Sequence, residues 1–426
     1  MSRLLPISFA GALLVSAALP AQASNSCTIK FRATNLSAGT NPQTIVTDDF
    51  NRDGKLDFAL VDYSGGGAGS VSVYLGNGDG TFQPKVDYPA GAGPDALAVG
   101  DVNGDGIADL VVGNDLGASV SVFLGNGDGT FQTPAFYSSG DVAGMAIGDF
   151  NNDGLLDIAV TDHSQRDVTI FLGNGDGTFH AGTAIIITPT QPKDIVVGDF
   201  NGDGLDDLAY SITTAVAGSS LSDLYVAFGK GDGTFKTPVL AASTVGEFLA
   251  SGDLNADNTP DIVATTITGA SHIGNSLFVL IGKGDGSFKN AVTYVSDIPS
   301  DPHIADVNGD GKPDIIAGGS YGALVYLGNG DGTFQPYTEP VIGGFALTYA
   351  VNAGDYNNDG NSDLVGTDAN NPRAAVSLSE VRQSADAAAL TGLAVFPLGS
   401  GTHYVEASYP GNSIYTSSIS ATTRPL

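Results

Sequence analysis

Short apolar stretches alternate with turns rich in glycine and aspartate along most of the chain. In one representative unit, residues 96–100 and 109–113 are short and apolar, and residues 119–124 alternate between apolar and polar. A fourth stretch, 131–137, follows a Gly-Asn-Gly-Asp-Gly turn and contains Pro134, which suits an edge strand. Runs of this length between such turns predict strands. Each unit is therefore expected to form four strands.

This unit recurs about every 50 residues, and a four-stranded repeat of that length is typical of a β-propeller blade. The seventh unit has only three predicted strands, at 346–354, 363–367 and 374–378, and one unassigned strand, 27–37, precedes the first unit. We expect this N-terminal strand to complete the last blade, because that removes exposed sheet edges. The predicted fold is all-β: a seven-bladed β-propeller of four-stranded blades, closed by the N-terminal strand, plus a short β tail.

A nine-residue motif between the first and second strands occurs seven times. Its first copy, Asp-Phe-Asn-Arg-Asp-Gly-Lys-Leu-Asp at 49–57, returns at 101–109, 149–157, 199–207, 253–261, 306–314 and 355–363. Positions 1, 3, 5 and 9 supply side-chain oxygens, position 7 supplies a carbonyl, and the glycine at position 6 permits a sharp turn, as in calcium-binding loops. The alternative is seven Asx-turns without metal. Sevenfold repetition between predicted strands favours calcium.

The sequence thus predicts up to seven structural Ca²⁺ ions. The fifth site is expected to be weaker, because Asn258 replaces the glycine, although asparagine tolerates the left-handed region. The predicted ligands are the residues at positions 1, 3, 5 and 9 of each copy: Asp49, Asn51, Asp53, Asp57, Asp101, Asn103, Asp105, Asp109, Asp149, Asn151, Asp153, Asp157, Asp199, Asn201, Asp203, Asp207, Asp253, Asn255, Asp257, Asp261, Asp306, Asn308, Asp310, Asp314, Asp355, Asn357, Asp359 and Asp363.

A second motif, Leu-Gly-Asn-Gly-Asp-Gly-Thr-Phe at 75–82, follows the Asp loop in each of the first six units. Its Asn-Gly and Asp-Gly pairs supply the positive φ values of a hairpin turn. The aspartates of this motif have the side chains to touch a cation, but turn formation explains them without one. They are Asp79, Asp128, Asp176, Asp232, Asp285 and Asp331.

At the Asp motifs the chain resembles the FG-GAP/VCBS repeat family, which includes the propellers of integrin α-subunits; the resemblance covers about residues 27–379. It implies a seven-bladed propeller whose Asp loops hold calcium ions that brace the blades and take no part in catalysis. No Arg-Gly-Asp sequence and no inserted adhesion domain is present, so an integrin-type role does not follow.

Composition narrows the class of protein further. The 426 residues carry a formal net charge of −30, with 42 Asp but only 4 Glu, 59 Gly, no Trp and one cysteine, Cys27. Asp and Gly are poor helix formers, which argues against a helical bundle. The acidic charge excludes a nucleic-acid binder that works by neutralising phosphates. A single cysteine excludes a disulfide framework and a zinc–thiolate site.

Both ends of the chain differ from the repeats. Residues 1–23 have the basic, apolar and small-residue regions of a secretory signal peptide, and no later segment is long and apolar enough to span a membrane.

The domains predicted are a signal peptide (1–23), a propeller (27–379), a linker (380–390) and a β tail (391–426) with strands at 393–397, 402–409 and 415–420. The tail resembles part of a bacterial immunoglobulin-like repeat. We expect an exported monomer: extracellular, at the cell surface or periplasmic.

The face opposite the Asp loops is the candidate for recognition, because its loops vary in length at 62–70, 211–222 and 266–276. Neutral drift in loop length is the alternative. Gly-x-Ser-x-Gly occurs once, at 318–322, but between two predicted strands and not before a helix, so it does not read as a nucleophile elbow, and His-Glu-x-x-His is absent. We therefore expect no enzyme but a module for a protein, matrix or glycan ligand. A lectin using Tyr63, Tyr210 and His272 is the first alternative, and an enzyme acting on polysaccharide is the second.

Overall fold

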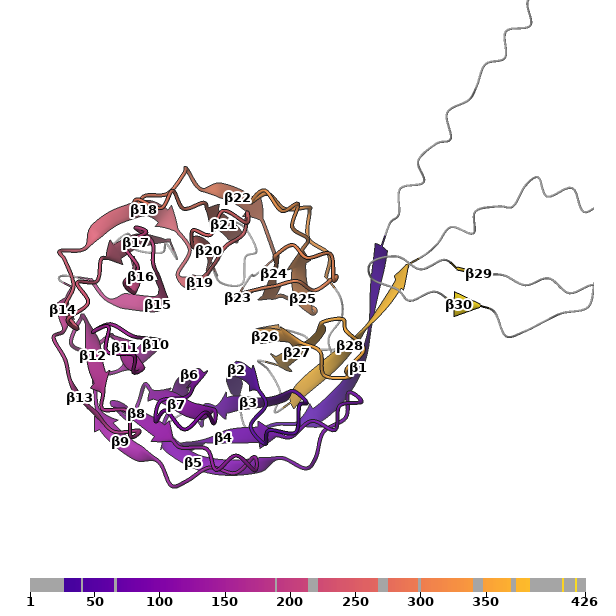
Figure 1. Ribbon diagram of the computed structural model, residues 1–426, viewed down its shortest axis with the longest axis horizontal. Helices are drawn as coiled ribbons and strands as arrows, with labels where there is room; N and C mark the ends of the chain where they lie inside the picture. The colour runs from indigo at the N-terminus through magenta and orange to yellow at the C-terminus, as the bar shows by residue number, and fades with distance from the viewer. Residues whose placement is uncertain are drawn as a thin grey trace, which may run out of the picture. The chain divides into compact units, whose positions relative to one another are not determined.

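The computed structural model describes residues 27–39, 41–64, 67–187, 190–213, 221–266, 275–297, 300–339, 348–368, 373–383, 408–409 and 418–419. Every regular element in these residues is a β-strand. The chain divides into two units, Thr28–Arg382 and the combination of Met1–Cys27 with Gln383–Leu426. The larger unit is a ring of antiparallel sheets (Figure 1). This confirms the all-β propeller.

Six sheets of the ring have four or more strands. In spatial order they are β2 (Pro42–Asp48), β3 (Asp57–Asp62), β4 (Ala68–Tyr74), β5 (Val86–Ala92); β6 (Pro94–Gly100), β7 (Asp109–Asn114), β8 (Ser119–Phe123), β9 (Ala135–Ser138); β10 (Val142–Gly148), β11 (Asp157–Asp162), β12 (Asp167–Gly173), β13 (Phe179–Ala181) with β14 (Ile185–Ile186); β15 (Pro192–Gly198), β16 (Asp207–Thr213), β17 (Ser222–Ala227), β18 (Val239–Val245); β19 (Phe248–Gly252), β20 (Asp261–Thr266), β21 (Ser276–Leu280), β22 (Val292–Val295); and β26 (Thr348–Gly354), β27 (Asp363–Asp368), β28 (Arg373–Gln383), β1 (Cys27–Ser37).

A further sheet has only three strands, β23 (Ser300–Ala305), β24 (Asp314–Gly318) and β25 (Ala323–Tyr326). The segment after it touches the outer side of β25 at one point, where Val325 and Thr338 exchange both backbone hydrogen bonds, at 2.8 and 2.9 Å. The described residues therefore confirm six complete blades, but they do not confirm the count of seven four-stranded blades.

The N-terminal strand lies beside the end of the repeat array, as predicted. β1 pairs with β28 and completes the sheet that contains β26 and β27. β28 continues to Gln383, so the first residues of the predicted linker 380–390 belong to a strand. The remainder of that linker and the predicted signal peptide lie outside the described residues. In the tail, only the short antiparallel pair β29 (Ser408–Tyr409) and β30 (Ser418–Ile419) is described.

The first strand of each sheet faces the centre of the ring, and neighbouring first strands contact one another in the closed order β2, β6, β10, β15, β19, β23, β26 and back to β2. The second strands are buried along their whole length, for example in β3, β7 and β11. This explains why they read as continuous apolar runs rather than as alternating ones.

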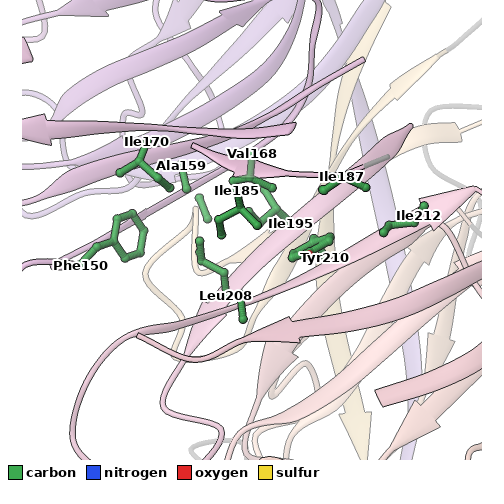
Figure 2. Packing of buried hydrophobic residues seen from close by; sticks show 12 residues of the cluster. Phe150, Ala159, Val168, Ile170, Ile185, Ile187, Ile195, Leu208, Tyr210 and Ile212 are labelled. Carbon is green, nitrogen blue, oxygen red and sulfur yellow. The ribbon is translucent and has the colours of Figure 1, made fainter. Parts of the chain in front are cut away.

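The hydrophobic core lies between neighbouring sheets rather than within one of them. In the cluster drawn in Figure 2, Ile170 and Ile185 of one sheet pack against Leu208 and Tyr210 of the next. Similar clusters fill the spaces between the other neighbouring sheets. A single unit therefore cannot bury its apolar faces without its neighbours, so the ring is the smallest unit that completes the core.

Candidate functional site

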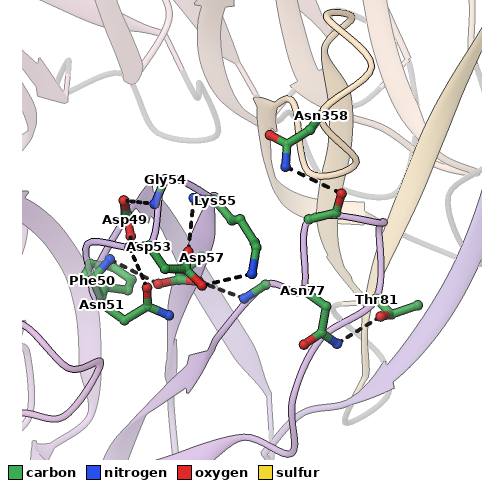
Figure 3. A network of polar contacts seen from close by, with 12 residues as sticks. Asp49, Phe50, Asn51, Asp53, Gly54, Lys55, Asp57, Asn77, Thr81 and Asn358 are labelled. Carbon is green, nitrogen blue, oxygen red and sulfur yellow. Dashed lines mark hydrogen bonds and ion pairs between the residues drawn. The ribbon is translucent and has the colours of Figure 1, made fainter.

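The Asp loop brings its side-chain oxygens together above the end of the first strand (Figure 3). In the first copy, both the Asp49 carboxylate and the Asn51 amide oxygen accept a hydrogen bond from the Asp53 N–H, at 3.1 and 2.9 Å. The second Asp49 oxygen accepts from the Gly54 N–H at 2.7 Å. The Asp53 carboxylate accepts from the Lys55 N–H at 3.0 Å. The loop therefore gathers oxygens from positions 1, 3 and 5 in a small exposed region.

All seven loops share one backbone conformation. Position 4 has positive φ in every copy, whether it is glycine, as at Gly104, or a larger residue, as at Arg52. Position 6 also has positive φ in every copy. Asn258, at φ 62°, adopts the conformation of the glycine it replaces, and its N–H reaches Asp253 at 2.7 Å. The fifth loop is thus folded like the others.

The ninth aspartate is placed differently from the other three predicted ligands. Asp57 is fully buried, and its two oxygens accept hydrogen bonds from the Phe50 N–H at 3.0 Å and the Gly76 N–H at 2.7 Å. Burial raises the pKa of this carboxyl to about 6, against the opposing effect of the two hydrogen bonds. The same pair of bonds recurs in the next five units. The ninth aspartate joins the Asp loop to the turn motif of its own sheet.

The Asp loop is also joined to the next sheet. The Gly129 N–H, in the turn motif of the second unit, donates to the Phe50 carbonyl at 3.1 Å. The Phe50 ring meets the Phe131 ring edge-on, with centroids 5.5 Å apart. The same backbone bond recurs from Gly80 to Tyr356, from Gly233 to Phe150 and from Gly286 to Phe200. The two motifs therefore lie on one face and link neighbouring blades there.

The turn-motif aspartates are engaged within their own turns. In each of the six copies, the carboxylate accepts hydrogen bonds from the backbone N–H and the hydroxyl two residues later. These bonds lower the pKa of Asp79 and of its equivalents. Turn formation accounts for these side chains.

The donor set of the Asp loops suits Ca²⁺, which prefers carboxylate and amide oxygens. Lysines offset the position 5 carboxylate in three loops: Lys55 lies 3.0 Å from Asp53, Lys236 lies 3.9 Å from Asp203, and Lys312 lies 3.7 Å from Asp310. Within the described ranges, no three His, Cys, Asp or Glu side chains are grouped as a metal site by themselves. An ion in these loops would therefore need the Asn51-type amide oxygen and a main-chain oxygen in addition to the carboxylates.

The predicted sugar-binding side chains do not form a platform. Tyr210 is fully buried and stacks on Tyr225, with centroids 6.2 Å apart. It belongs to the core, so the prediction that Tyr210 serves as a surface platform is wrong: its strand is buried on both sides. Tyr63 is half-buried, and His272 lies outside the described residues. Most of the two longer variable loops, 211–222 and 266–276, lies outside them as well.

The centre of the ring holds a cavity of about 480 Å³ whose lining includes residues of all seven first strands. Five of the lining residues are polar and lie at or just before the beginning of a first strand: Asp95, Lys193, Glu247, Asp301 and Tyr349. Each first strand ends at an Asp loop, so these groups lie at the opposite end of the channel. Burial raises the pKa of Asp95 to about 6 and also raises that of Glu247.

These polar groups at the channel mouth were not predicted from the sequence, although the repeat carries a signal for them. In four units, a polar residue lies five positions before the last residue of the first strand. These residues are Asp95, Lys193, Glu247 and Tyr349. When the units are aligned at the last residue of the first strand, this position holds a polar residue in strands that are otherwise mostly apolar.

The comparison with family models agrees with the fold. The model of the FG-GAP-like repeat matches residues 49–112, 101–160, 149–210, 253–317 and 306–366. No curated protein matches the sequence. Among 381 matching chains of solved structures is a lectin of Agrocybe aegerita described for its specific recognition of non-reducing terminal N-acetylglucosamine. It is 20% identical, with a TM-score of 0.48, and the match covers 80% of this chain and 87% of that one. Because the matched repeats together cover more than half of the sequence, the chain belongs to the FG-GAP-like repeat family.

Proposed function

We propose that this protein is an exported, calcium-braced, seven-bladed β-propeller that works as a ligand-binding or adhesion module and not as an enzyme. The observation that supports this most strongly is the Asp loop, which appears seven times in one conformation with its oxygens gathered at the surface. A metal ion in each loop would strengthen the place where neighbouring blades are already linked. Rigid scaffolds of this kind present recognition loops.

The three-stranded sheet β23–β25 is proposed to be the seventh blade. Its first strand occupies its own place in the ring, between β19 and β26. Its Asp loop, 306–314, has the same hydrogen bonds as the other loops. The bond pair between Val325 and Thr338 is where a fourth strand would begin to pair.

Calcium would be held by the position 1 and position 5 carboxylates and the position 3 amide oxygen, with a carbonyl from position 7. The positive charge of the ion would reduce the repulsion between the carboxylates of positions 1 and 5 in each loop. The position 9 carboxylate has lone pairs beyond those used by its two N–H donors, so a contribution from it is compatible with its role in the fold.

The experiment is thermal unfolding of the secreted protein in calcium and in EDTA, together with titration calorimetry. An ion that binds only the folded state raises its stability, so chelation should lower the melting temperature. A matched pair of variants gives the control: Asp49→Ala with Asp53→Ala should abolish part of the calcium effect, whereas Asp79→Ala with Asp128→Ala should leave it unchanged. An identical melt in calcium and EDTA would refute the calcium proposal.

The ligand class and the export are open to direct tests. A glycan array would separate a lectin from a protein or matrix binder, and turnover of polysaccharide would contradict the non-enzymatic role. N-terminal sequencing of protein recovered outside the cytoplasm should begin after Ala23. No helix in the described residues is long and apolar enough to cross a membrane.

A further inference from the structure

The central channel has the size of a small-molecule site, and its polar groups gather at the mouth on the side away from the Asp loops. Its volume of about 480 Å³ lies within the usual range of ligand pockets. Its wall comes from strands that are held by the sheets behind them, and not from mobile loops. Apolar side chains such as Val46, Leu97 and Ile195 share the lining with the polar groups at the mouth.

The charge of this mouth is unbalanced. The carboxylates of Asp95, Asp194, Glu247 and Asp301 line it, whereas Lys193 is its only ammonium group among the described residues. Besides burial, the charges of Asp115 and Asp301 raise the pKa of Asp95, whereas the Lys193 charge lowers the pKa of both Asp95 and Glu247. All four lining carboxylates act on the Tyr349 hydroxyl in the same direction. All four carboxylates therefore contribute to the negative potential at one place inside the ring.

Not all of these carboxylates are used by the fold. Asp194 has a structural role, because its oxygens accept from the Leu249 N–H at 2.7 Å and the Ile195 N–H at 2.8 Å. Asp301 lies 3.6 Å from the His303 imidazole. No hydrogen bond or ion pair within the described part of the chain ends on the Asp95 or Glu247 carboxylate. Both side chains are half-buried, so their carboxylates keep acceptor oxygens that no described group of the fold uses and that are open to a bound donor.

We propose that the channel mouth binds a small organic cation with one or two primary ammonium groups, held by Asp95, Glu247 and Asp301. An ammonium group brings three donors to acceptors that lack them. Tyr349 and Phe248 also line the cavity, and aromatic rings attract cations that approach their faces. The site is separate from the Asp loops and does not depend on their calcium.

The test is calorimetric titration of the folded, calcium-supplemented protein with 1,4-diaminobutane, with 1,4-butanediol as the uncharged analogue of equal length. Saturable binding of the diamine and no binding of the diol are expected. Asp95→Asn with Glu247→Gln should weaken diamine binding by at least about tenfold, which corresponds to about 1.4 kcal/mol. Asp128→Asn with Asp176→Asn removes the same charge at exposed turns and should leave binding unchanged.

Three outcomes would overturn the proposal: no saturable binding of the diamine, equal binding of the diol, or equal weakening in the two double variants. Melting temperatures show whether each variant is folded, and we expect the channel variant to be at least as stable as the parent because it removes two half-buried charges. If that variant did not fold, the single Glu247→Gln variant would take its place, with the same expected direction. Failure of diamine binding would leave the calcium experiment unaffected, so the two proposals can fail separately.

Discussion

Replacing the ninth aspartate of one Asp loop by alanine should destabilise the ring even when no calcium is present. Asp157 is fully buried, and its carboxylate accepts hydrogen bonds from the Phe150 N–H at 2.9 Å and the Gly173 N–H at 2.8 Å. The Asp157→Ala variant would leave both N–H groups buried without an acceptor. Each unsatisfied group costs about 1–3 kcal/mol. The expected loss in the free energy of unfolding is therefore about 2–6 kcal/mol.

The assay is urea unfolding at neutral pH, in EDTA and again in calcium. Asp153→Ala is the matched control in the same loop, because the Asp153 side chain is exposed and accepts only the Leu155 N–H, at 2.9 Å. It should cost less than about 1 kcal/mol in EDTA and should show a larger loss only in calcium. Asp157→Asn keeps one acceptor oxygen and should fall between the two.

The result that would refute this reasoning is an Asp157→Ala variant as stable as the parent in EDTA. That outcome would mean that the ninth carboxylate acts only through the metal, and that its two hydrogen bonds contribute nothing to the fold. A loss seen in both conditions would support the role assigned to it by the structure.

Three further predictions concern single features. Asn258→Gly should raise stability by up to about 1 kcal/mol in urea unfolding, because the φ of 62° is free of steric cost for glycine, whereas asparagine only tolerates it better than other residues do; a loss would contradict this. Asp95 has a folded-state pKa of about 6 against 3.8, so the folded protein holds this proton more tightly and loses stability as pH rises from about 4 to 6. Asp95→Asn should remove that loss, which is at most about 3 kcal/mol; parallel pH profiles would count against it. Deleting 28–37 should unpair β28, lower the melting temperature and promote self-association in size-exclusion chromatography; an unchanged monomer would disprove the closure.

Much of the architecture was predictable because it depends on short-range patterns repeated many times. The Asp motif and the turn motif fix their loops through positive φ at defined positions, and most of these positions are Gly or Asn in the sequence, although position 4 also holds Arg52 and Ala256. The pairing of β1 with the last sheet was also predictable, because the seventh unit has only three predicted strands and one remained at the start.

The role of the ninth aspartate and the contents of the channel were not predictable in the same way. The sequence does not distinguish a position 9 carboxylate that faces an ion from one that accepts from two buried N–H groups. In the first unit, the second N–H comes from Gly76, which lies on another part of the sheet. Tyr210 looked like a surface ring because it lies near a variable loop, yet the neighbouring sheet covers it.

By itself, the sequence determined the strands, the loops and their order, because each of these is set within a few residues by φ preferences and apolar spacing. Only the tertiary structure decided which groups meet across the ring. Asp95, Glu247 and Asp301 are far apart in the chain and line one cavity because ring closure brings the first strands together. Burial and mutual repulsion at that place, and not the residue types alone, make them candidates for binding.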